Sequence, residues 1–340
     1  MRVVSGKYRG RKIISPEGND VRPTSDMVKE NIFNVIQFDI AGSKFLDLFC
    51  GSGGVGIEAL SRGASKVTFV DKSRMSIELT KANLQGIKDD YDIVPRNALD
   101  ALRGIREQQN FIFVDPPYKS DYINDICDIV AERDLLADGG YIIYEHDIYK
   151  KYQLSNQYFL AKSKKYGKIV VDYIQKTKTI AAVTGSFDPM TKGHMWLVEK
   201  ALEEFDKVVV IVAINEEKHY MFDLEERKQI LMDALRDYPN VAVESTSGMV
   251  YELCQQLGVK VIVRGYRNQA DLEYEQIISK FNKEHGDIDT MLVQSHDMEI
   301  NSTNVRQALE SGNSIKGLVP ENCIKTIKKI FGEKNERDEY

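Results

Sequence analysis

Two short segments carry side chains whose types and spacing suit chemistry. The first is Asp115-Pro116-Pro117-Tyr118, directly after the apolar run 111–114. A site that methylates an exocyclic amine must hold the NH₂ group with acceptors and stack the base once it is flipped out. Asp115 offers a carboxylate, the Pro116 carbonyl offers a second acceptor, and Tyr118 offers a ring face. This order of residues predicts methyl transfer to a nucleobase amine.

A glycine-rich segment earlier in the chain, LDLFCGSGGVGIEAL, predicts where the methyl donor binds. Gly51 and Gly53 allow the backbone to turn sharply after a strand and to pass close to a ligand. Asp47 lies in the preceding strand, and Asp71 ends the next strand, where a carboxylate can accept hydrogen bonds from ribose hydroxyls. Because a carboxylate beside the loop suits a cationic ligand better than a pyrophosphate, we expect S-adenosylmethionine rather than NAD.

The second segment, GSFDPMTKGH, covers residues 185–194 and follows another apolar run. It predicts a strand, a turn at Asp188-Pro189 and a helix that begins at Gly193 and His194. A hydroxyl, an imidazole and helix-start N–H groups would then surround one anion, which suits a triphosphate. His194 would donate to phosphate oxygens as negative charge develops on the α-phosphorus, and it need not act as a base.

Alternating strands and helices must position the first set of residues. We expect strands over 44–49, 66–71, 92–95, 111–114, 140–145, 158–162 and 169–174, and helices over 57–63, 72–84 and 121–133. This alternation predicts a parallel sheet covered on both faces. The short connection KSKKYGK between the last two strands predicts an antiparallel ending, with Lys162, Lys164, Lys165 and Lys168 exposed in the connection.

The alternation begins again at Thr179. We expect strands over 179–183, 207–213, 241–245, 259–265 and 290–294, with helices over 193–205, 224–235, 249–257 and 270–282 and two further helices after them. The fold class is therefore α/β with two doubly wound domains, over residues 1–176 and 178–332, followed by a charged, frayed tail over 333–340. No Gly/Ser-rich or Pro-rich linker separates the domains, so we expect a close tether.

The bulk composition is that of a globular protein. The chain has 340 residues, of which 42% are hydrophobic and 29% are charged, and this length favours two domains. No apolar window is long enough to span a membrane, and the first residues lack the apolar core of a signal peptide, so we expect a cytoplasmic protein without a membrane partner. The cysteines are too far apart for a zinc site or a disulfide framework; they are Cys50, Cys127, Cys254 and Cys323.

The charge is distributed unevenly between the halves. Residues 1–176 hold 26 Lys and Arg against 24 Asp and Glu, whereas the remaining residues hold 20 against 28. Basic residues dominate the first 30 positions, namely Arg2, Lys7, Arg9, Arg11, Lys12, Arg22 and Lys29. A basic arm favours a polyanionic partner, although a basic terminus is also often only a solvated surface.

Residues 1 to about 176 resemble the bacterial 16S rRNA guanine-N2 methyltransferases of the RsmD type. The resemblance runs through VSGKYRGRK, RPTSDMVKENIFN, the glycine-rich segment, RNALD and FVDPPY. It implies that the 30S subunit or its 16S rRNA is the substrate, that Asp115, Pro116 and Tyr118 are catalytic, and that the cofactor contacts are Asp47, Gly51, Gly53, Asp71, Asn97 and Ala98. It also implies that Arg22 and Thr24 lie near the substrate entrance. The Asp-Pro-Pro-Tyr motif occurs in DNA adenine-N6 methyltransferases too, but we find no separate target-recognition domain, which favours RNA.

Residues 178 to 332 resemble bacterial phosphopantetheine adenylyltransferases, through GSFDPMTKGH, KHYMFDLEERKQI, VIVRGYRNQADLEYE and INSTNVR. The resemblance implies in-line attack of 4′-phosphopantetheine on the α-phosphorus of ATP, with Mg²⁺ held by the phosphates and no metal ligand from the protein. It implies a hexamer and three catalytic residues, His194, Lys218 and Arg264. The implied ATP contacts are Gly185, Ser186, Phe187, Thr191, Gly193, Arg267, Glu275, Ser302 and Thr303. The implied acceptor contacts are Ser186, Lys218, Val250, Arg264 and Asn282.

Some alternatives stay open at this stage. Asn301-Ser302-Thr303 replaces the usual serine triplet and leans toward nicotinamide mononucleotide adenylyltransferases, whereas Arg264 and Arg267 favour pantetheine. The first half could instead be a non-catalytic RNA-binding scaffold or a DNA adenine-N6 methyltransferase. The two reactions share no intermediate, so the sequence predicts a bifunctional enzyme with independent activities.

Overall fold

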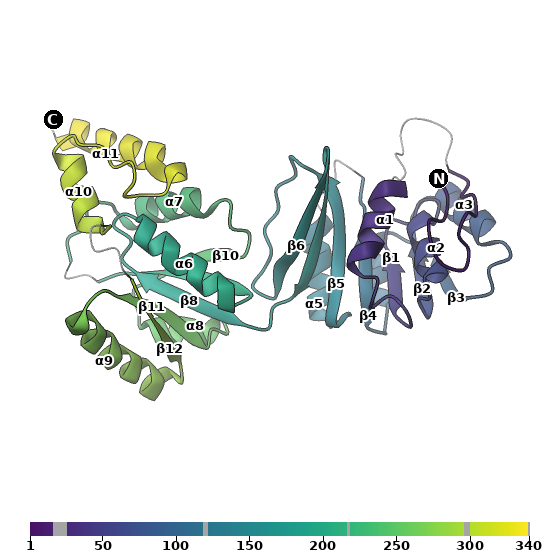
Figure 1. Cartoon of the computed structure of the whole chain (residues 1–340), viewed down its shortest axis with the longest axis horizontal. Helices are drawn as coiled ribbons and strands as arrows, with labels where there is room; N and C mark the ends of the chain where they lie inside the picture. Colours follow the sequence, from purple (N-terminus) through teal and green to yellow (C-terminus); the bar gives the residue numbers. More distant parts are fainter. Residues whose placement is uncertain (16–25, 118–121, 216–217, 296–299, 339–340) are drawn as a thin grey trace. The chain divides into compact units, whose positions relative to one another are not determined.

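The structure, a computed structural model, describes residues 1–15, 26–117, 122–215, 218–295 and 300–338. The chain forms two compact units, Met1–Lys176 and Thr177–Tyr340. Figure 1 labels their helices and strands, and each unit holds one sheet with helices on both faces. Among the described residues, no helix has both the length and the apolar character needed to cross a membrane.

The first unit contains one seven-stranded sheet. Its strands are β1 (Lys44–Asp47), β2 (Lys66–Val70), β3 (Asp90–Val94), β4 (Gln109–Val114), β5 (Leu136–Asp147), β6 (Tyr158–Tyr166) and β7 (Ile169–Lys176). Its helices are α1 (Asp26–Val35), α2 (Gly54–Ser61), α3 (Arg74–Leu84), α4 (Ala98–Gly104) and α5 (Tyr122–Glu132). The strand order is β3-β2-β1-β4-β5-β7-β6, in which β7 is antiparallel to β5 and β6 while the other pairs are parallel. The order reverses between β1 and β4, the position where open α/β sheets bind ligands.

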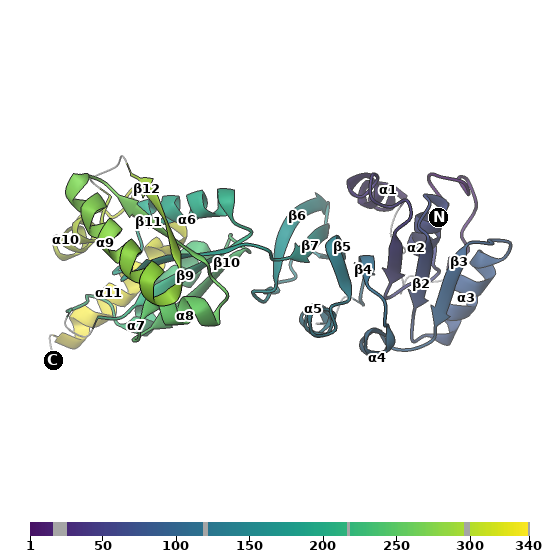
Figure 2. The ribbon, with the colours of Figure 1, turned by 90° about the horizontal axis from the view of Figure 1, so that it is seen from below.

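Alternate residues of the central strands face opposite sides of this sheet. Phe45 and Phe111 belong to a buried cluster with α1 and α2, whereas Leu46 and Ile112 belong to one with α4 and α5. Figure 2 shows α1 and α5 on opposite sides of the sheet. Burial on both faces accounts for the nearly continuous apolar runs of these strands.

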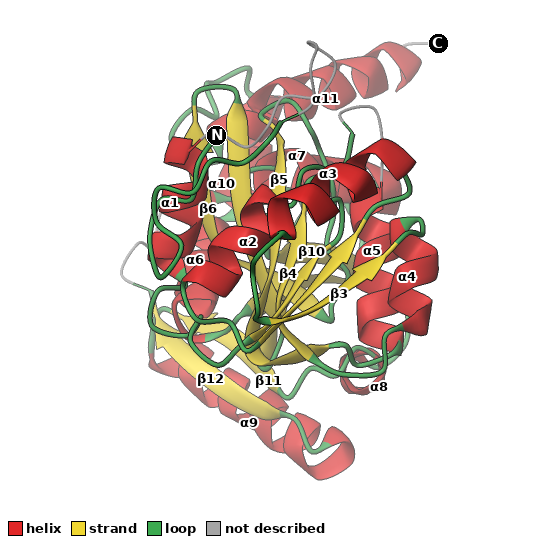
Figure 3. Cartoon of the chain, turned by 90° about the vertical axis from the view of Figure 1, so that its right-hand side faces the viewer, coloured by secondary structure: helices red, strands yellow, loops and turns green. Residues whose placement is uncertain are grey.

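The second unit contains a five-stranded parallel sheet of order β10-β9-β8-β11-β12. The strands are β8 (Ile180–Gly185), β9 (Lys207–Ala213), β10 (Val241–Thr246), β11 (Val261–Tyr266) and β12 (Asp289–Gln294). Helices α6 (Lys192–Glu204), α7 (Leu224–Leu235), α10 (Ser302–Glu310) and α11 (Ile324–Asp338) share a buried cluster on one face. Helix α8 (Val250–Gln256) packs on the other face, and α9 (Gln269–Gly286) lies along β11 and β12 (Figure 3).

The α/β fold class expected from the sequence is confirmed, but several elements differ from expectation. Helices α1 and α4 were not anticipated, and β6 runs to Tyr166 instead of ending at Lys162. Three of the lysines placed in a connection, Lys162, Lys164 and Lys165, therefore belong to a strand. The reason is that β6 is an edge strand, whose exposed positions tolerate charge and so hide the strand pattern. Helix α11 continues to Asp338, through most of the segment expected as a frayed tail.

A buried carboxylate joins the N-terminal segment to two helices. Glu58 on α2 and Lys29 on α1 are both fully buried, with 3.5 Å between the Lys29 Nζ and the Glu58 Oε2. The Glu58 carboxylate also accepts hydrogen bonds from the backbone N–H groups of Val4 and Ser5, at 2.7 and 2.9 Å, and from Arg62 Nε at 2.8 Å. Burial lowers the pKa of Lys29, against the opposing effect of Glu58. This network holds the basic N-terminal segment in one position.

Replacing Glu58 with Gln should lower the free energy of unfolding of the first unit by about 3 kcal/mol, because it leaves the buried Lys29 ammonium with only the half-exposed Asp26 as a counter-charge, at 3.6 Å. Urea unfolding followed by circular dichroism measures this change. The single tryptophan, Trp196, reports the second unit by fluorescence, and its transition should stay where it is. Glu78→Gln on α3 is the matched control, because Glu78 forms only an exposed ion pair with Lys81. Equal effects of the two substitutions would contradict this interpretation.

Two candidate active sites

The first candidate site begins with the glycine turn after β1. Gly51 and Gly53 have φ values of 52° and 76°, in the left-handed region that favours glycine. Asp71, directly after β2, accepts a hydrogen bond from Gly51 N at 3.0 Å and another from Ser73 N at 2.8 Å. A Cβ added to Gly51 would meet no atom within 4 Å, so there is open space beside the turn. The turn is thus fixed from one side and accessible from the other.

Asp47 lies behind this turn at the end of β1. It is 1% exposed, and its Oδ2 accepts a hydrogen bond from Gly56 N at 3.0 Å. Burial raises the pKa of Asp47 to about 7, and the negative charge of Asp71 adds to this effect. A cation bound at the turn would favour the ionised carboxylate. The charge of Asp47 therefore depends on what the turn binds.

Asn97 follows β3 and caps α4. Its side chain accepts a hydrogen bond from Asp100 N at 2.9 Å, and the next residue, Ala98, is buried. Because β1, β2 and β3 are parallel neighbours, their carboxyl ends lie at one edge of the sheet. The structure therefore brings the sequence-predicted cofactor residues to this edge, namely Asp47, Gly51, Gly53, Asp71, Asn97 and Ala98.

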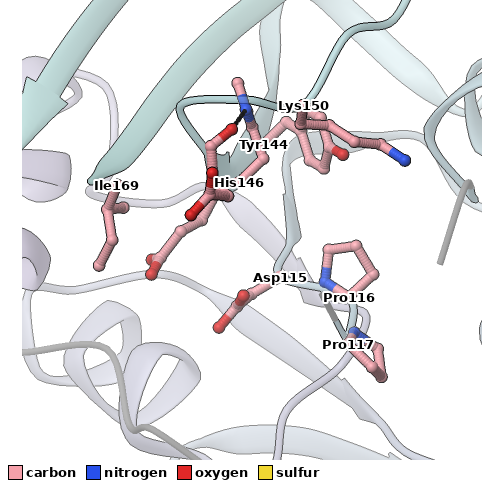
Figure 4. A pocket seen from close by; sticks show the side chains of 9 residues that line it. Asp115, Pro116, Pro117, Tyr144, His146, Lys150 and Ile169 are labelled. Carbon is pink, nitrogen blue, oxygen red and sulfur yellow. Dashed lines mark hydrogen bonds between the residues drawn. The ribbon is translucent and has the colours of Figure 1, made fainter. Parts of the chain in front are cut away.

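A small pocket opens at the carboxyl ends of β4 and β5. It is lined by Asp115, Pro116, Pro117, Tyr144, Glu145, His146, Asp147, Lys150 and Ile169. Figure 4 shows Asp115, Pro116 and Pro117 on one side of this pocket and Tyr144, His146 and Ile169 on the other. Three predicted residues, Arg22, Thr24 and Tyr118, lie outside the described residues.

Sequence reasoning missed the residues that β5 contributes to the pocket. The available signal was the sequence YEHD at the end of an apolar strand. Val114 of β4 pairs with Tyr144 of β5, so this polar end of β5 lies directly beside the Asp-Pro-Pro segment. Nothing in the sequence alone identified β5 as the parallel neighbour of β4.

A buried polar network fixes the β5 side of the pocket. His146 Nε2 lies 2.8 Å from the Asp172 carboxylate, which also accepts a hydrogen bond from the Tyr152 hydroxyl at 2.5 Å. Burial alone would raise the pKa of Asp172, but hydrogen bonds from His146, Ser163 and Tyr152 outweigh it and lower the pKa. The His146 ring stacks on Tyr144, with 4.7 Å between the ring centroids. The network thereby holds the aromatic wall of the pocket.

The second candidate site is built around the start of α6. Thr191 caps the helix, because its Oγ1 accepts a hydrogen bond from His194 N at 3.3 Å. The His194 ring makes the reciprocal hydrogen bond. Its Nδ1 lies 3.1 Å from Thr191 N and can only accept from that N–H group. This contact assigns the proton of a neutral imidazole to Nε2. Removal from solvent lowers the pKa of His194 to about 4, and Arg267 and Arg264 add to this effect. His194 is therefore a neutral hydrogen-bond donor.

Asp188 connects three segments of this site through hydrogen bonds. Its carboxylate accepts hydrogen bonds from the backbone N–H groups of Met221 and Phe222, both at 2.9 Å. Its carbonyl accepts a hydrogen bond from Arg306 Nη1 at 2.6 Å. Lys218 is exposed and lies three residues before Met221 in the loop between β9 and α7. Asp188 thus fixes the loop that carries Lys218 and joins it to α10.

Arg264 is held from two sides at the end of β11. Its Nε and Nη2 donate to the Glu275 carboxylate at 2.7 and 2.8 Å. Its Nη1 donates to the carbonyl and the hydroxyl of Thr184, at 3.1 and 2.7 Å. Glu275, expected from the resemblance as an ATP contact, is therefore the partner that orients Arg264 here.

The remaining predicted residues near α6 are also fixed by local contacts. Ser186 accepts a hydrogen bond from Arg227 through its carbonyl, Phe187 packs edge-on to His194, and Gly193 approaches Ile300 so closely that a Cβ would lie 3.2 Å from its carbonyl oxygen. Ser302 donates to the Pro189 carbonyl, and Thr303 accepts from Arg306. Gly185 ends β8. The structure gathers these residues where β8, α6 and α10 meet.

Two predicted acceptor contacts lie apart from this group. Asn282 is buried 13 positions beyond the first residue of α9, which corresponds to about 20 Å along the helix axis. It therefore lies toward the opposite edge of the sheet. Val250 begins α8 and packs in the cluster on the other face. Within the described ranges, no three His, Cys, Asp or Glu side chains gather as metal ligands.

Comparisons with known proteins divide the chain in the same way. Residues 1–175 match the family described as Conserved hypothetical protein 95, and residues 182–308 match the family described as Cytidylyltransferase-like. A phosphopantetheine adenylyltransferase from Flavobacterium psychrophilum is 38% identical over 143 residues, which are 42% of this chain and 95% of that protein.

Two further similar proteins are methyltransferases by name. The putative rRNA methyltransferase YlbH of Bacillus subtilis is 42% identical over 154 residues, which are 43% of this chain and 83% of that protein. Among solved structures, the putative methyltransferase yhhF from Escherichia coli has a TM-score of 0.48 and 28% identity, covering 52% of this chain and 97% of that one.

The neutral state of His194 can be tested by NMR. In protein labelled at its five histidines, the imidazole signal that disappears in His194→Asn should not shift between pH 8 and pH 5.5, because its pKa is about 4. Free histidine, whose imidazole has a pKa near 6.5, is the reference. A midpoint near 6.5 for the His194 signal would show that the ring gains charge near neutral pH, against this assignment.

Proposed function

We propose that this chain is a bifunctional enzyme, because it belongs to two families. Residues 1–175 belong to the Conserved hypothetical protein 95 family, and the second half belongs to the phosphopantetheine adenylyltransferases. The first unit transfers a methyl group from S-adenosylmethionine to the N2 amine of a guanine in 16S rRNA. The second unit transfers AMP from ATP to 4′-phosphopantetheine, giving dephospho-CoA and pyrophosphate.

The observation that carries the first activity is the pocket at the carboxyl ends of β4 and β5, which Asp115 and Glu145 both line. Strand β4 is the sheet neighbour of β1, which leads into the glycine turn. The Watson–Crick edge of guanine presents two neighbouring donors, N1–H and the N2 amine, whereas adenine has an acceptor beside its amine. Two carboxylates at one pocket suit the guanine pattern. The exposed residues Arg2, Arg9 and Lys12 of the N-terminal segment supply positive charge for an RNA backbone, whereas Lys7 pairs with Asp89 and Lys29 is buried against Glu58.

S-adenosylmethionine fits the residues at the glycine turn. The open space beside Gly51, the carboxylate of Asp71 and the buried Asp47 suit a ligand with a ribose and a positive charge. When bound there, the cofactor supplies an electrophilic methyl group on a sulfonium. We assign the Asp115 carboxylate and the Pro116 carbonyl to accept the two N–H bonds of the amine, which directs the nitrogen lone pair at that methyl group. Asp115 then accepts the proton that the nitrogen loses.

The second reaction is an in-line displacement at phosphorus. An oxygen of the 4′-phosphopantetheine phosphate bonds to the α-phosphorus of ATP, and the bond to pyrophosphate breaks. We assign His194 Nε2–H and the Arg264 guanidinium to stabilise the charge that develops on the α-phosphate oxygens. Thr191, Gly193, Ser302 and Thr303 line the triphosphate side, and Lys218 meets the incoming phosphate. Mg²⁺ enters with the nucleotide on its phosphate oxygens.

Two further properties concern the cellular location and the oligomeric state of the enzyme. We place the enzyme in the cytoplasm, and we propose that the second unit forms the hexamer that the resemblance implies. Because each of the two compact units carries its own candidate site, we propose that the two activities are independent.

Reciprocal substitutions test this independence. His194→Ala should reduce dephospho-CoA formation by at least about 100-fold and leave methyl transfer unchanged, because it removes a donor to the charged transition state. Asp115→Ala should do the reverse, to a similar extent, because it removes the amine acceptor. Methyl transfer is measured with labelled cofactor and unmodified 30S particles, and adenylyl transfer by pyrophosphate release. Loss of both activities from one substitution would contradict independent sites.

The same assays separate the alternatives. Mass spectrometry of the labelled nucleosides distinguishes N2-methylguanosine from an N6-methyladenine product made on DNA. RNA binding without any methyl transfer would identify the first unit as a scaffold. Faster adenylylation of nicotinamide mononucleotide than of phosphopantetheine would overturn the assigned acceptor.

The affinity for S-adenosylmethionine should depend on pH through Asp47. Because the raised pKa of about 7 leaves this carboxyl mostly protonated at pH 5.5, a cationic ligand should bind about tenfold more weakly at pH 5.5 than at pH 7. The amino group of the ligand, with an ordinary pKa near 7.7, stays charged over this range. Calorimetry on the wild type and on Asp47→Asn measures the effect, and the variant should show no such dependence. An equally steep pH dependence in the variant would rule out Asp47 as its source.

A further inference from the structure

Strand β6 presents a row of lysines at one edge of the first sheet. Lys162, Lys164 and Lys165 lie within the strand, and Lys168 lies in the turn that joins it to β7. All four residues are exposed. In the described part of the chain, none of their ammonium groups forms an ion pair with a carboxylate. None of these four lysines takes part in the methyl transfer proposed for the first unit.

The strand register places two of these lysines on the same face of the sheet as part of the pocket. Lys164 of β6 pairs with Val171 of β7, which pairs in turn with Glu145 of β5. Directly paired residues on neighbouring strands point to the same face. Lys164 therefore lies on the face of Glu145, two strand spacings away, or about 10 Å.

Lys162 lies on the same face, two pairs further along. It pairs with Tyr173, which packs in the buried cluster with α1 and α2. Val3 and Ile13 of the basic N-terminal segment belong to that same cluster. The face of the sheet covered by α1 and α2 therefore carries positive charge in two places. One is β6, beyond the pocket, and the other is the N-terminal segment.

Lys165 has the opposite orientation. It pairs with Val170, which pairs with His146, and side chains alternate along a strand. Lys165 therefore points to the face of α4 and α5. Strand β6 thus carries lysines on both faces of the sheet, Lys162 and Lys164 on the face of Glu145 and Lys165 on the opposite face.

We propose that Lys162 and Lys164 bind backbone phosphates of the RNA strand whose guanine enters the pocket, an inference that rests on the proposed function. Flipping a base out of its stack costs unstacking energy, and phosphate contacts beside the flipped nucleotide fix the position of the strand without reading its sequence. The N-terminal segment holds the strand on one side, and β6 holds it on the other. The ligand of β6 is a run of phosphates, not a base.

The competing role of these lysines is protection of an open edge. Lysines on an edge strand discourage pairing with another sheet, and this role requires no RNA. Protection depends on charge at the edge in general, whereas phosphate binding depends on the face that the charge occupies. The two roles therefore predict different results for substitutions at neighbouring positions of β6.

The test compares the full-length double variant K162Q/K164Q with the wild type, using unmodified 30S particles and 16S rRNA fragments. Loss of two phosphate contacts should reduce the slope of log affinity against log salt by about 1.4 to 1.8 and weaken RNA binding roughly 30-fold near 0.1 M salt. The KM for RNA should rise in parallel. The kcat at saturating RNA, the affinity for S-adenosylmethionine and the rate of adenylyl transfer should stay at the wild-type values.

Two controls make the result specific. R103Q/R106Q removes the same charge near the amino end of β4, at the edge of the sheet opposite the pocket, and K165Q removes charge from the other face of β6. Both should keep the wild-type salt slope.

If the double variant binds RNA as these controls do, the inference is overturned. Methyl transfer by the wild type in the same experiment still upholds the proposed function. Self-association of the double variant with unchanged RNA affinity also overturns the inference, in favour of edge protection. Absence of both RNA binding and methyl transfer in the wild type overturns the proposed function itself.

Discussion

Each candidate site depends on a carboxylate that accepts hydrogen bonds from the backbone N–H groups of its own loops. Asp71 accepts from Gly51 and Ser73 in the first unit, and Asp188 accepts from Met221 and Phe222 in the second. The hydrogen-bond ladder of a parallel sheet stops at the ends of its strands, so the loops beyond need other partners for their backbone groups. An ionised acceptor makes stronger bonds than a neutral one. Residues on these loops can therefore keep a fixed position without belonging to a helix or strand.

Burial then sets the charge of the reactive groups in opposite ways. It raises the pKa of Asp47 to about 7, so that this carboxylate gains its charge most readily beside a cationic ligand. It lowers the pKa of His194 to about 4, so that the imidazole stays neutral and keeps a hydrogen on Nε2. The first site thereby adjusts to the charge of its cofactor, whereas the second offers a permanent donor to a highly charged substrate. Both properties follow from where the strands end and how deep the side chains lie.

The sequence was sufficient for the fold class, because glycine turns and apolar runs are local patterns, whereas the roles it suggests for the motif residues stay predictions. It was not sufficient for features that depend on which strands are neighbours. The polar end of β5 joins the pocket only because Tyr144 pairs with Val114, and Glu275 orients Arg264 only because α9 packs along β11. The strand nature of residues 163–166 was missed because an edge strand with charges on both faces lacks the usual alternation. Side-chain roles that cross between elements need coordinates.

The division at Lys176 is also a division in the order of synthesis. The strands and helices described for the first unit end at or before that residue, and no described segment of the second unit enters its sheet. Domains generally fold as units during translation, with the N-terminal one first. The methyltransferase half can therefore close its sheet while the ribosome is still adding the adenylyltransferase half. One messenger RNA then yields the two enzymes in a fixed one-to-one ratio, without either half waiting for the other to acquire its structure.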